Sequence, residues 1–366
     1  MSTLFSTVGR IFTLRPALFG RRGFGQRSVA AEASASFDWT MIFLSGWLLG
    51  GAYLDAWAHQ HLRLETFFTP WHAILYSGLL ATVGFLGFHT IRNVIRGAPW
   101  RTALPAGYEL SGFGCVLFII AGVSDLGWHT LFGIDVSVAG LVSPTHLLLM
   151  LSAGLVVTGP LRAAWRSRKA VAPYSAVISA AGLLSLMSLF EQIDHPFVEL
   201  WSAGDPSDIL LPFYAMELGV IGIVLQSGVI MAVVLLMLRR FVLPAGSVTL
   251  IFGINAALVS IVREQFLMIG VALLAGAAAD TFLSFAGRPL QGRALRLFSF
   301  LTPAFLTLTY FAVLMTTQGV WWSVHVWAGS IVVAGLVGWL LSYLVEPPGQ
   351  APPPDPTGSL GRRTHA

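Results

Sequence analysis

The chain has 366 residues, of which 55% are hydrophobic and 10% are charged, and its formal net charge is +4. Because soluble domains carry about 25% charged residues, this composition excludes an ordinary soluble protein and indicates an integral membrane protein. The single cysteine, Cys115, excludes an intrachain disulfide framework and a cysteine-based metal cluster.

Apolar segments recur along the chain at about the length of 20 residues that a helix needs to cross a bilayer. We find ten of them, at residues 39–58, 71–91, 107–128, 144–165, 174–194, 211–238, 246–262, 265–286, 294–317 and 322–345. Only Arg263 and Glu264 mark the boundary between the seventh and the eighth. We therefore expect an all-α fold, a polytopic integral membrane bundle of about ten transmembrane helices.

The two ends of the chain differ in composition from the apolar middle. Residues 1–37 are predicted to be a basic cytoplasmic tail, residues 38–345 the transmembrane helical domain, and residues 346–366 a disordered proline-rich tail. The first 31 residues hold five arginines and no acidic residue, a composition that a mitochondrial transit peptide would share. A bacterial basic tail fits the topology better, and an organellar origin is the alternative.

Lysines and arginines lie on alternate connections between the predicted helices. Nineteen of the 21 fall in the two tails or after even-numbered helices, and only Arg63 and Arg263 lie on the opposite side. By the positive-inside rule both termini are expected to be cytoplasmic, in a multi-pass protein of the bacterial inner (plasma) membrane. The lipid bilayer is therefore the expected partner. No nucleic-acid partner is expected, and membrane partner subunits or a homo-oligomer are left open.

The first six predicted helices form three repeated helical hairpins, at about residues 38–103, 104–170 and 171–240. In each hairpin an acidic residue lies four positions before a histidine at the end of the first helix. A proline lies two positions before a polar ring at the start of the second helix. The pattern recurs about every 68 residues, which indicates an internal repeat.

The polar residues at the hairpin mouths are candidate metal ligands. They are Asp55, His59 and His72 in the first hairpin, Asp125, His129 and His146 in the second, and Glu191 and His195 in the third, where Tyr214 stands in place of the last histidine. Side chains at positions i and i+4 of a helix lie on one face, about 5–6 Å apart. An acid and an imidazole so placed can reach one cation, and such nitrogen and oxygen ligands suit copper, zinc or iron.

The pattern Asp55-x3-His59-x12-His72, closed by "ETFFTPWH", resembles the metal-site motif of the C subunit of the copper membrane monooxygenases, the particulate methane and ammonia monooxygenases. In that family an aspartate, a histidine four residues later and a histidine in an "FTPSH"-like segment bind copper, and a second, similar site has asparagine in place of the aspartate. The resemblance implies that the first hairpin binds copper, with zinc or iron less favoured, and that the second hairpin is the paired site. It covers about 20 residues in each hairpin, and Trp71 stands where the family has serine.

Together, the residues predict an integral membrane metalloprotein with Asp/His sites at the non-cytoplasmic face. The resemblance implies an oxidase or a monooxygenase-like enzyme that acts on an apolar substrate. A metal-ion transporter or metal-handling protein is an alternative, for which Asp280 and Glu217 are the candidate polar groups deeper in the membrane. A haem-binding membrane protein and a structural membrane subunit are further alternatives. The sequence identifies no catalytic residue and leaves open whether the protein is an enzyme.

Overall fold

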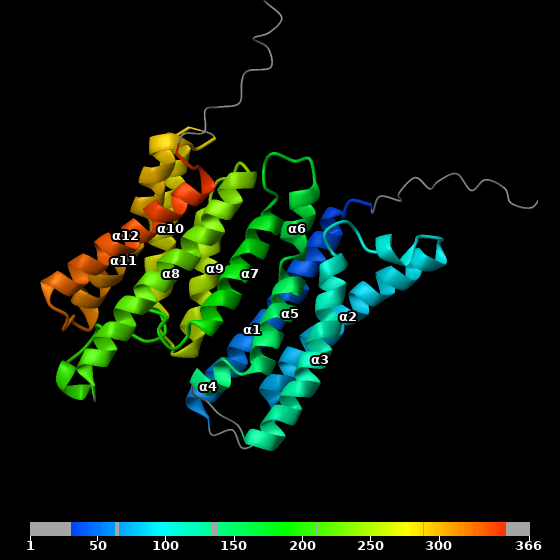
Figure 1. The fold of residues 1–366 in the computed structure, drawn as a ribbon, viewed down its shortest axis with the longest axis horizontal. Helices are drawn as coiled ribbons and strands as arrows, with labels where there is room; N and C mark the ends of the chain where they lie inside the picture. Colours follow the sequence, from blue (N-terminus) through cyan, green and yellow to red (C-terminus); the bar gives the residue numbers. More distant parts are fainter. Residues whose placement is uncertain (1–30, 63–65, 134–137, 210, 288, 349–366) are drawn as a thin grey trace, which may run out of the picture.

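The computed structural model describes residues 31–62, 66–133, 138–209, 211–287 and 289–348. Most of the two predicted tails, and Arg63 and Arg288 among the basic residues of the connections, lie outside these described residues. Within the described ranges the chain is all-helical, with two isolated β-bridges and no strand (Figure 1). The all-α prediction is therefore confirmed for this part of the chain.

Each of the ten predicted segments coincides with one helix or, in one case, with a bent pair of helices. In chain order the elements are α1 (Ala35–His61), α2 (Pro70–Ile95), the 3-10 turn η1 (Trp100–Thr102), α3 (Glu109–Phe132), α4 (Val138–Leu141), α5 (Pro144–Val157), α6 (Gly159–Arg166), α7 (Tyr174–Phe190), η2 (Pro206–Asp208), α8 (Pro212–Arg240), α9 (Ser247–Val262), α10 (Leu267–Phe285), α11 (Gly292–Thr317) and α12 (Val324–Val345).

Six of these helices, α2, α3, α8, α10, α11 and α12, are long and apolar enough to cross a membrane, and α5 with α6 adds a seventh if the bent pair is one span. α7 and α9 are apolar but have only 17 and 16 residues. At 1.5 Å per residue such helices reach about 25 Å, short of the ~30 Å hydrocarbon core. The described chain is compatible with a polytopic membrane bundle, and ten crossings stay a prediction.

The fourth predicted segment is bent, because α5 and α6 meet at 45°. Pro160 has no N–H to continue the helical ladder, and its ring crowds the carbonyl one turn earlier. Arg162 stabilises the break, since its guanidinium donates to the Leu155 carbonyl oxygen at 2.7 Å and to the Ser111 hydroxyl of α3 at 2.9 Å. The bend is therefore held against the neighbouring helix α3.

Two hydrophobic clusters form the core. One lies among α1, α2, α3 and α5, and the other lies mainly among α7 to α12. Helices that follow one another in the chain pack as pairs, α1 with α2 and α3 with α5 among them, and α7 contacts helices of both groups (Figure 1). Small residues let such pairs approach closely. A Cβ atom added to Gly51 of α1 would lie 2.7 Å from the Leu75 Cα of α2, so this glycine sets the distance between the two helices.

Asp280 of α10 closes the N-terminus of α9. Its carboxylate oxygens accept hydrogen bonds from the Val248 N–H at 3.2 Å, the Thr249 N–H at 2.8 Å and the Thr249 hydroxyl at 2.7 Å. The first N–H groups of a helix have no intrahelical partners and favour a negative charge nearby. This carboxylate therefore joins α9 to α10.

Candidate metal centre

The last two turns of α1 and the first turn of α2 bring three predicted ligands together. The Asp55 Oδ2 atom lies 3.6 Å from the His59 Nε2 atom on the same helix and 3.5 Å from the His72 Nε2 atom on α2. These separations exceed the 2.7–3.2 Å of ordinary hydrogen bonds. We call Asp55, His59 and His72 the first triad.

The start of α2 orients His72. Thr69 is the N-cap, and its hydroxyl accepts a hydrogen bond from the His72 N–H at 3.2 Å, while Pro70 occupies the first helical position. The His72 Nδ1–H donates to the Phe67 carbonyl oxygen at 2.5 Å, which leaves the Nε2 atom facing Asp55. Metal-bound histidines are typically held by such a bond from the other ring nitrogen.

The opposite face of the C-terminal end of α1 contacts the turn between α9 and α10. The Trp57 indole N–H donates to the Glu264 carboxylate at 3.2 Å, and the His61 Nε2 atom lies 4.0 Å from the same carboxylate. Glu264 lies in the turn between α9 and α10 with a positive φ of 59°, an uncommon conformation for a residue other than glycine. His61 therefore points away from the first triad, and its contacts help to fix the end of α1.

The second hairpin repeats the arrangement. The Asp125 Oδ2 atom of α3 lies 3.5 Å from the His129 Nε2 atom, and the Asp125 Oδ1 atom lies 3.5 Å from the His146 Nδ1 atom of α5. At the start of α5, Ser143 is the N-cap, Pro144 follows, and the Ser143 hydroxyl accepts from the His146 N–H at 3.3 Å. We call Asp125, His129 and His146 the second triad.

The second triad has additional hydrogen bonds. The Thr145 hydroxyl donates to the Asp125 Oδ1 atom at 2.7 Å, and the Ser143 hydroxyl lies 2.8 Å from the His146 Nδ1 atom. The His129 Nδ1–H donates to the Gly133 carbonyl oxygen at 3.1 Å, so its Nε2 lone pair faces the carboxylate, as in the first triad. Thr145 was not among the predicted site residues, although it stands between the proline and the histidine of "SPTH".

Both triads fit a metal ion. In each, one donor atom from every residue lies within 4.8 Å of the other two. Nitrogen and oxygen ligands about 2.0–2.2 Å from a common ion lie up to about 4.4 Å apart, so a small inward movement completes either site. In the first triad the Asp55 Oδ1 and His59 Nδ1 atoms are buried and lack a hydrogen-bond partner among the described residues. Such orphaned atoms are costly, and a cation bound by the Asp55 carboxylate would relieve the part of that cost that belongs to the carboxylate oxygen.

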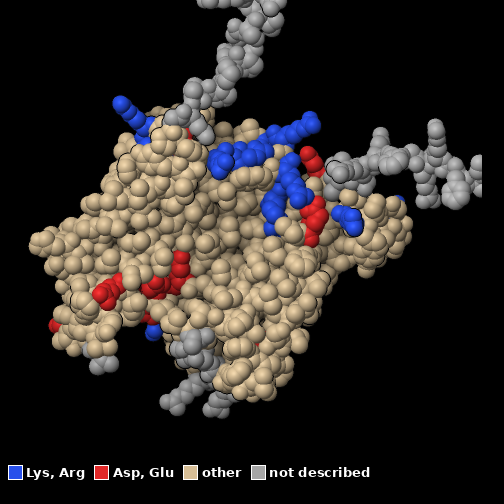
Figure 2. Space-filling view, in the orientation of Figure 1, with Lys and Arg blue, Asp and Glu red and all other residues tan. Residues whose placement is uncertain are grey.

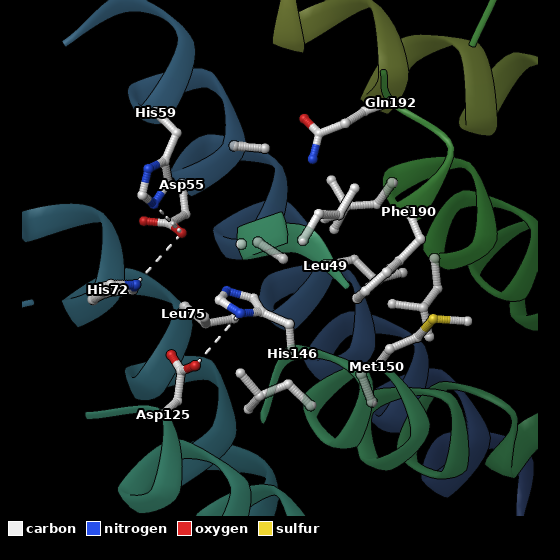
Figure 3. A pocket seen from close by; sticks show the side chains of 18 of the residues that line it. Leu49, Asp55, His59, His72, Leu75, Asp125, His146, Met150, Phe190 and Gln192 are labelled. Atoms are coloured by element: carbon white, nitrogen blue, oxygen red, sulfur yellow. Dashed lines mark ion pairs between the residues drawn. The ribbon is translucent and has the colours of Figure 1, made fainter. Parts of the chain in front are cut away.

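The two triads line one cavity (Figure 3). Its volume is about 150 Å³, and its walls come from α1, α2, α3, α5 and α7 with the short helix α4. Apart from the triads, Tyr76, Gln60 and Gln192 are its polar side chains, and the other walls are apolar, including Leu49, Met150 and Phe190. The six candidate ligands were predicted from the sequence, whereas the common cavity and these other lining residues were not.

The third predicted pair lies differently. His195 is fully buried after the end of α7, and its Nδ1 atom accepts from the Phe197 N–H at 3.0 Å. The His195 Nε2 and Glu191 Oε2 atoms are buried without a hydrogen-bond partner in the described chain. Tyr214 is 60% exposed. Among the described residues the two triads are the groups of three that could hold a metal ion, and Glu191 and His195 as ligands stay a prediction.

Burial moves the pKa values of this pair in opposite directions. It lowers the pKa of the His195 imidazole to about 3. Burial, together with the charge of nearby Asp194, raises the pKa of the Glu191 carboxyl to about 7. Both shifts favour the uncharged form of a group removed from water.

Comparisons with protein-family models, with curated proteins and with solved structures found no match to this chain.

Proposed function

We propose that this protein is an integral membrane metalloprotein that binds copper in the first and second triads and uses the cavity between them for oxidation of a small apolar substrate. The observation that carries the proposal is that both Asp/His triads face one cavity. Two separate structural ion sites would not need a common space. The resemblance of the first triad to the copper motif of the membrane monooxygenases supports copper over zinc or iron.

The shape and lining of the cavity suit a small apolar molecule. A cavity of about 150 Å³ lined by aliphatic and aromatic side chains is known to admit molecules the size of benzene. Leucine, methionine and phenylalanine side chains would hold such a molecule by apolar contact next to the triads. Copper held there would supply the redox chemistry for oxygen activation. The protein's part is to hold the ligands, exclude bulk water and place the substrate.

The distribution of charge supports the proposed orientation. Lysine and arginine side chains gather at the end of the bundle where α6 and α8 end, whereas the triads lie toward the other end (Figures 1 and 2). We therefore place the cavity at the non-cytoplasmic face of a bacterial inner membrane, with both termini cytoplasmic. The organisation of the first six helices as repeated hairpins belongs to the same proposal, as does assembly with partner subunits or with further copies of the chain.

Transport of the metal is the rival function. An inward path needs polar groups beyond the triads, and Asp280 and Glu217 are the candidates for them. The Asp280 side chain has protein partners. Its carboxylate is engaged by the N-terminus of α9. Copper uptake into proteoliposomes tests this rival, since transport predicts uptake that falls in an Asp280→Asn/Glu217→Gln variant. An absorption spectrum of the purified protein tests the haem alternative.

Elemental analysis of the detergent-purified, copper-loaded full chain tests the metal sites. We expect two equivalents of copper in the wild type and one in each of the double variants Asp55→Ala/His59→Ala and Asp125→Ala/His129→Ala. His61→Ala is the matched control, because His61 is adjacent to the first triad but faces Glu264, and it should keep both ions. Wild-type protein without copper, or equal loss in the His61 variant, would contradict the proposal.

Catalysis requires a separate test. Reconstituted protein with a suitable electron donor should consume oxygen in the presence of a short-chain alkane and form the corresponding alcohol. Both double variants should lose this activity. Full copper occupancy without alcohol formation would support the proposed metal binding and contradict the proposed oxidase activity.

A further inference from the structure

A second cavity lies at the end of the bundle opposite the triads, and it does not enter the proposed function. Its volume is about 310 Å³, and it lies among the segment after α6, the end of α8, the end of α10 and the segment before α11. Three arginines line it, Arg168, Arg239 and Arg240, with apolar walls that include Leu238, Phe241 and Leu283. We call this cavity the basic pocket.

The positive charge of the basic pocket has no acidic counterpart. No carboxylate is among its described lining residues. The guanidinium groups of Arg168 and Arg239 make no hydrogen bond or ion pair with any residue in the described ranges. The guanidinium of nearby Arg166, by contrast, pairs with the Glu109 carboxylate at 2.7 Å. Like charges that share one cavity repel, so a bound anion would stabilise the pocket.

Arg240 and the neighbouring backbone build the wall of the pocket. The Arg240 guanidinium donates to three main-chain carbonyl oxygens, those of Trp165, Ser167 and Lys169, at 2.6–3.3 Å. The Val242 N–H also donates to the Ala170 carbonyl oxygen at 2.9 Å. These bonds fix the segment after α6 against the end of α8, so the pocket is formed before any ligand arrives.

The position of the pocket points to the chemistry of its ligand. α8 is one of the apolar candidate spans, and it ends at Arg240, so the pocket lies at the end of that candidate span. Lysine and arginine side chains gather on the surface at this end of the bundle (Figure 2). Phe285, the last residue of α10, is 87% exposed and lies two residues along the chain from the lining residues Leu283 and Gly287, so it provides an apolar surface near the end of the same helix. A ligand that joins an anionic group to apolar chains matches both features.

We propose that the basic pocket binds the headgroup of an anionic phospholipid from the cytoplasmic leaflet. Its volume is at the lower end of the ~300–1,000 Å³ typical of ligand sites, enough for a phosphate and glycerol but not for the acyl chains. Those chains would lie outside, along the apolar surface of the helices. Arginine side chains bind phosphate oxygens through two parallel N–H groups, and basic pockets between helices on this side of a membrane bind anionic headgroups.

The test measures lipid binding to the detergent-purified full chain through the rise of its thermal unfolding midpoint. Dioleoyl phosphatidylglycerol should raise the midpoint in a saturable manner, while dioleoyl phosphatidylcholine and inorganic phosphate should not. In the Arg168→Gln/Arg239→Gln variant the apparent dissociation constant should rise roughly 25-fold, about fivefold for each arginine. Arg240 is left intact, because it holds three carbonyl groups.

The matched control is Arg96→Gln/Arg101→Gln, which removes the same charge from the same end of the bundle, at exposed residues outside the pocket. It should bind phosphatidylglycerol as the wild type does. If the double pocket variant does not fold, Arg239→Gln with lipid counting by native mass spectrometry replaces it. Equal stabilisation by phosphatidylcholine, a full effect of phosphate alone, or an equal loss in the control would each overturn the proposal. Copper content should be unchanged in both variants, so this result is independent of the triads.

Discussion

The first and second triads share a local construction but differ in how their carboxylates are held. In both, an acid and a histidine one turn apart end one helix, and a capped Thr/Ser-Pro start presents a second histidine from the next. The Asp125 side chain is 3% exposed and accepts a hydrogen bond from Thr145, whereas Asp55 is 16% exposed and has one oxygen without a partner. The carboxylate of the second triad therefore has a hydrogen-bond donor from the protein, whereas one oxygen of the first triad's carboxylate has none.

The difference predicts opposite behaviour of two alanine variants with and without copper. In metal-free protein Asp125→Ala should lower the free energy of unfolding by about 1–3 kcal/mol, since it leaves the buried Thr145 hydroxyl without its acceptor. Asp55→Ala should cost less than about 1 kcal/mol, because the orphaned oxygen is removed with the charge. The measurement is chemical or thermal unfolding of both metal-free variants.

Saturating copper should reverse the order of stability of the Asp125→Ala and Asp55→Ala variants. A ligand at 1,000 times its dissociation constant stabilises the native state by about 4 kcal/mol. Copper should raise the unfolding midpoint of Asp125→Ala more than that of Asp55→Ala, because only the former keeps the triad whose carboxylate has an oxygen without a protein partner. Equal shifts in the two variants would show that the two triads are energetically equivalent.

The spacing of α1 and α2 provides a way to disturb the first triad alone. A Cβ atom at Gly51 would meet the Leu75 backbone at 2.7 Å, whereas one at Gly50 has nothing within 4 Å. Gly51→Ala should therefore separate the two helices, lower the free energy of unfolding by about 1–3 kcal/mol and reduce copper at the first triad while the second keeps its ion. Gly50→Ala is the matched control, since its Cβ atom meets no neighbour. The measurement is the copper content of Gly51→Ala and Gly50→Ala, and similar values for both variants would contradict this geometry.

Thr145 allows a smaller and more local change at the second triad. Thr145→Val removes the hydroxyl that donates to Asp125 at nearly constant volume, and we expect copper affinity at this triad to fall about 10–100-fold. Thr145→Ser keeps the hydroxyl and should retain the affinity. Titration with a competing chelator distinguishes the two variants, and the first triad should be unaffected in both. Equal affinity in the valine and serine variants would mean that the bond does not orient the carboxylate.

The sequence predicted those parts of the site that depend on neighbours along one helix. The i, i+4 pairs and the proline-led starts of α2 and α5 are local features, and they converge as expected. The common cavity depends on how α1 and α2 pack against α3, α5 and α7, which no local pattern contains. The third pair shows the same limit of local prediction. A long connection, not a tight turn, joins α7 to Pro212, and Tyr214 is exposed.

Among the helices, too, local features were predicted and contacts between distant segments were not. Apolar length predicted the segment of every helix except the short α4 and the two 3-10 turns, since burial in lipid or protein requires the backbone to satisfy itself. The bend at Pro160 and the role of Asp280 were not predicted. The first depends on hydrogen bonds from Arg162 to α3, and the second on the N-terminus of α9, which lies more than 30 residues earlier in the chain than the carboxylate.

The third pair extends the comparison to a site whose pH response should be independent of metal. His195 is neutral in the folded protein, because burial lowers its pKa from 6.5 to about 3, whereas the unfolded chain takes up a proton near the ordinary value. The unfolded state therefore binds more protons below pH 6.5, and this histidine makes stability fall as the pH is lowered. Glu191 acts in the opposite sense: its pKa is raised to about 7, so the stability it contributes at low pH is lost as the pH rises.

Comparison of the wild type with His195→Asn separates these effects, since asparagine can still accept from the Phe197 N–H and Glu191 is present in both proteins. The wild type should lose about 1 kcal/mol of stability relative to the variant between about pH 6.5 and about pH 5.5. The same loss is expected with and without copper, because the triads are unchanged by the substitution. A lower copper content in His195→Asn than in the wild type would instead indicate that Glu191 and His195 bind the metal, as the hairpin pattern predicts.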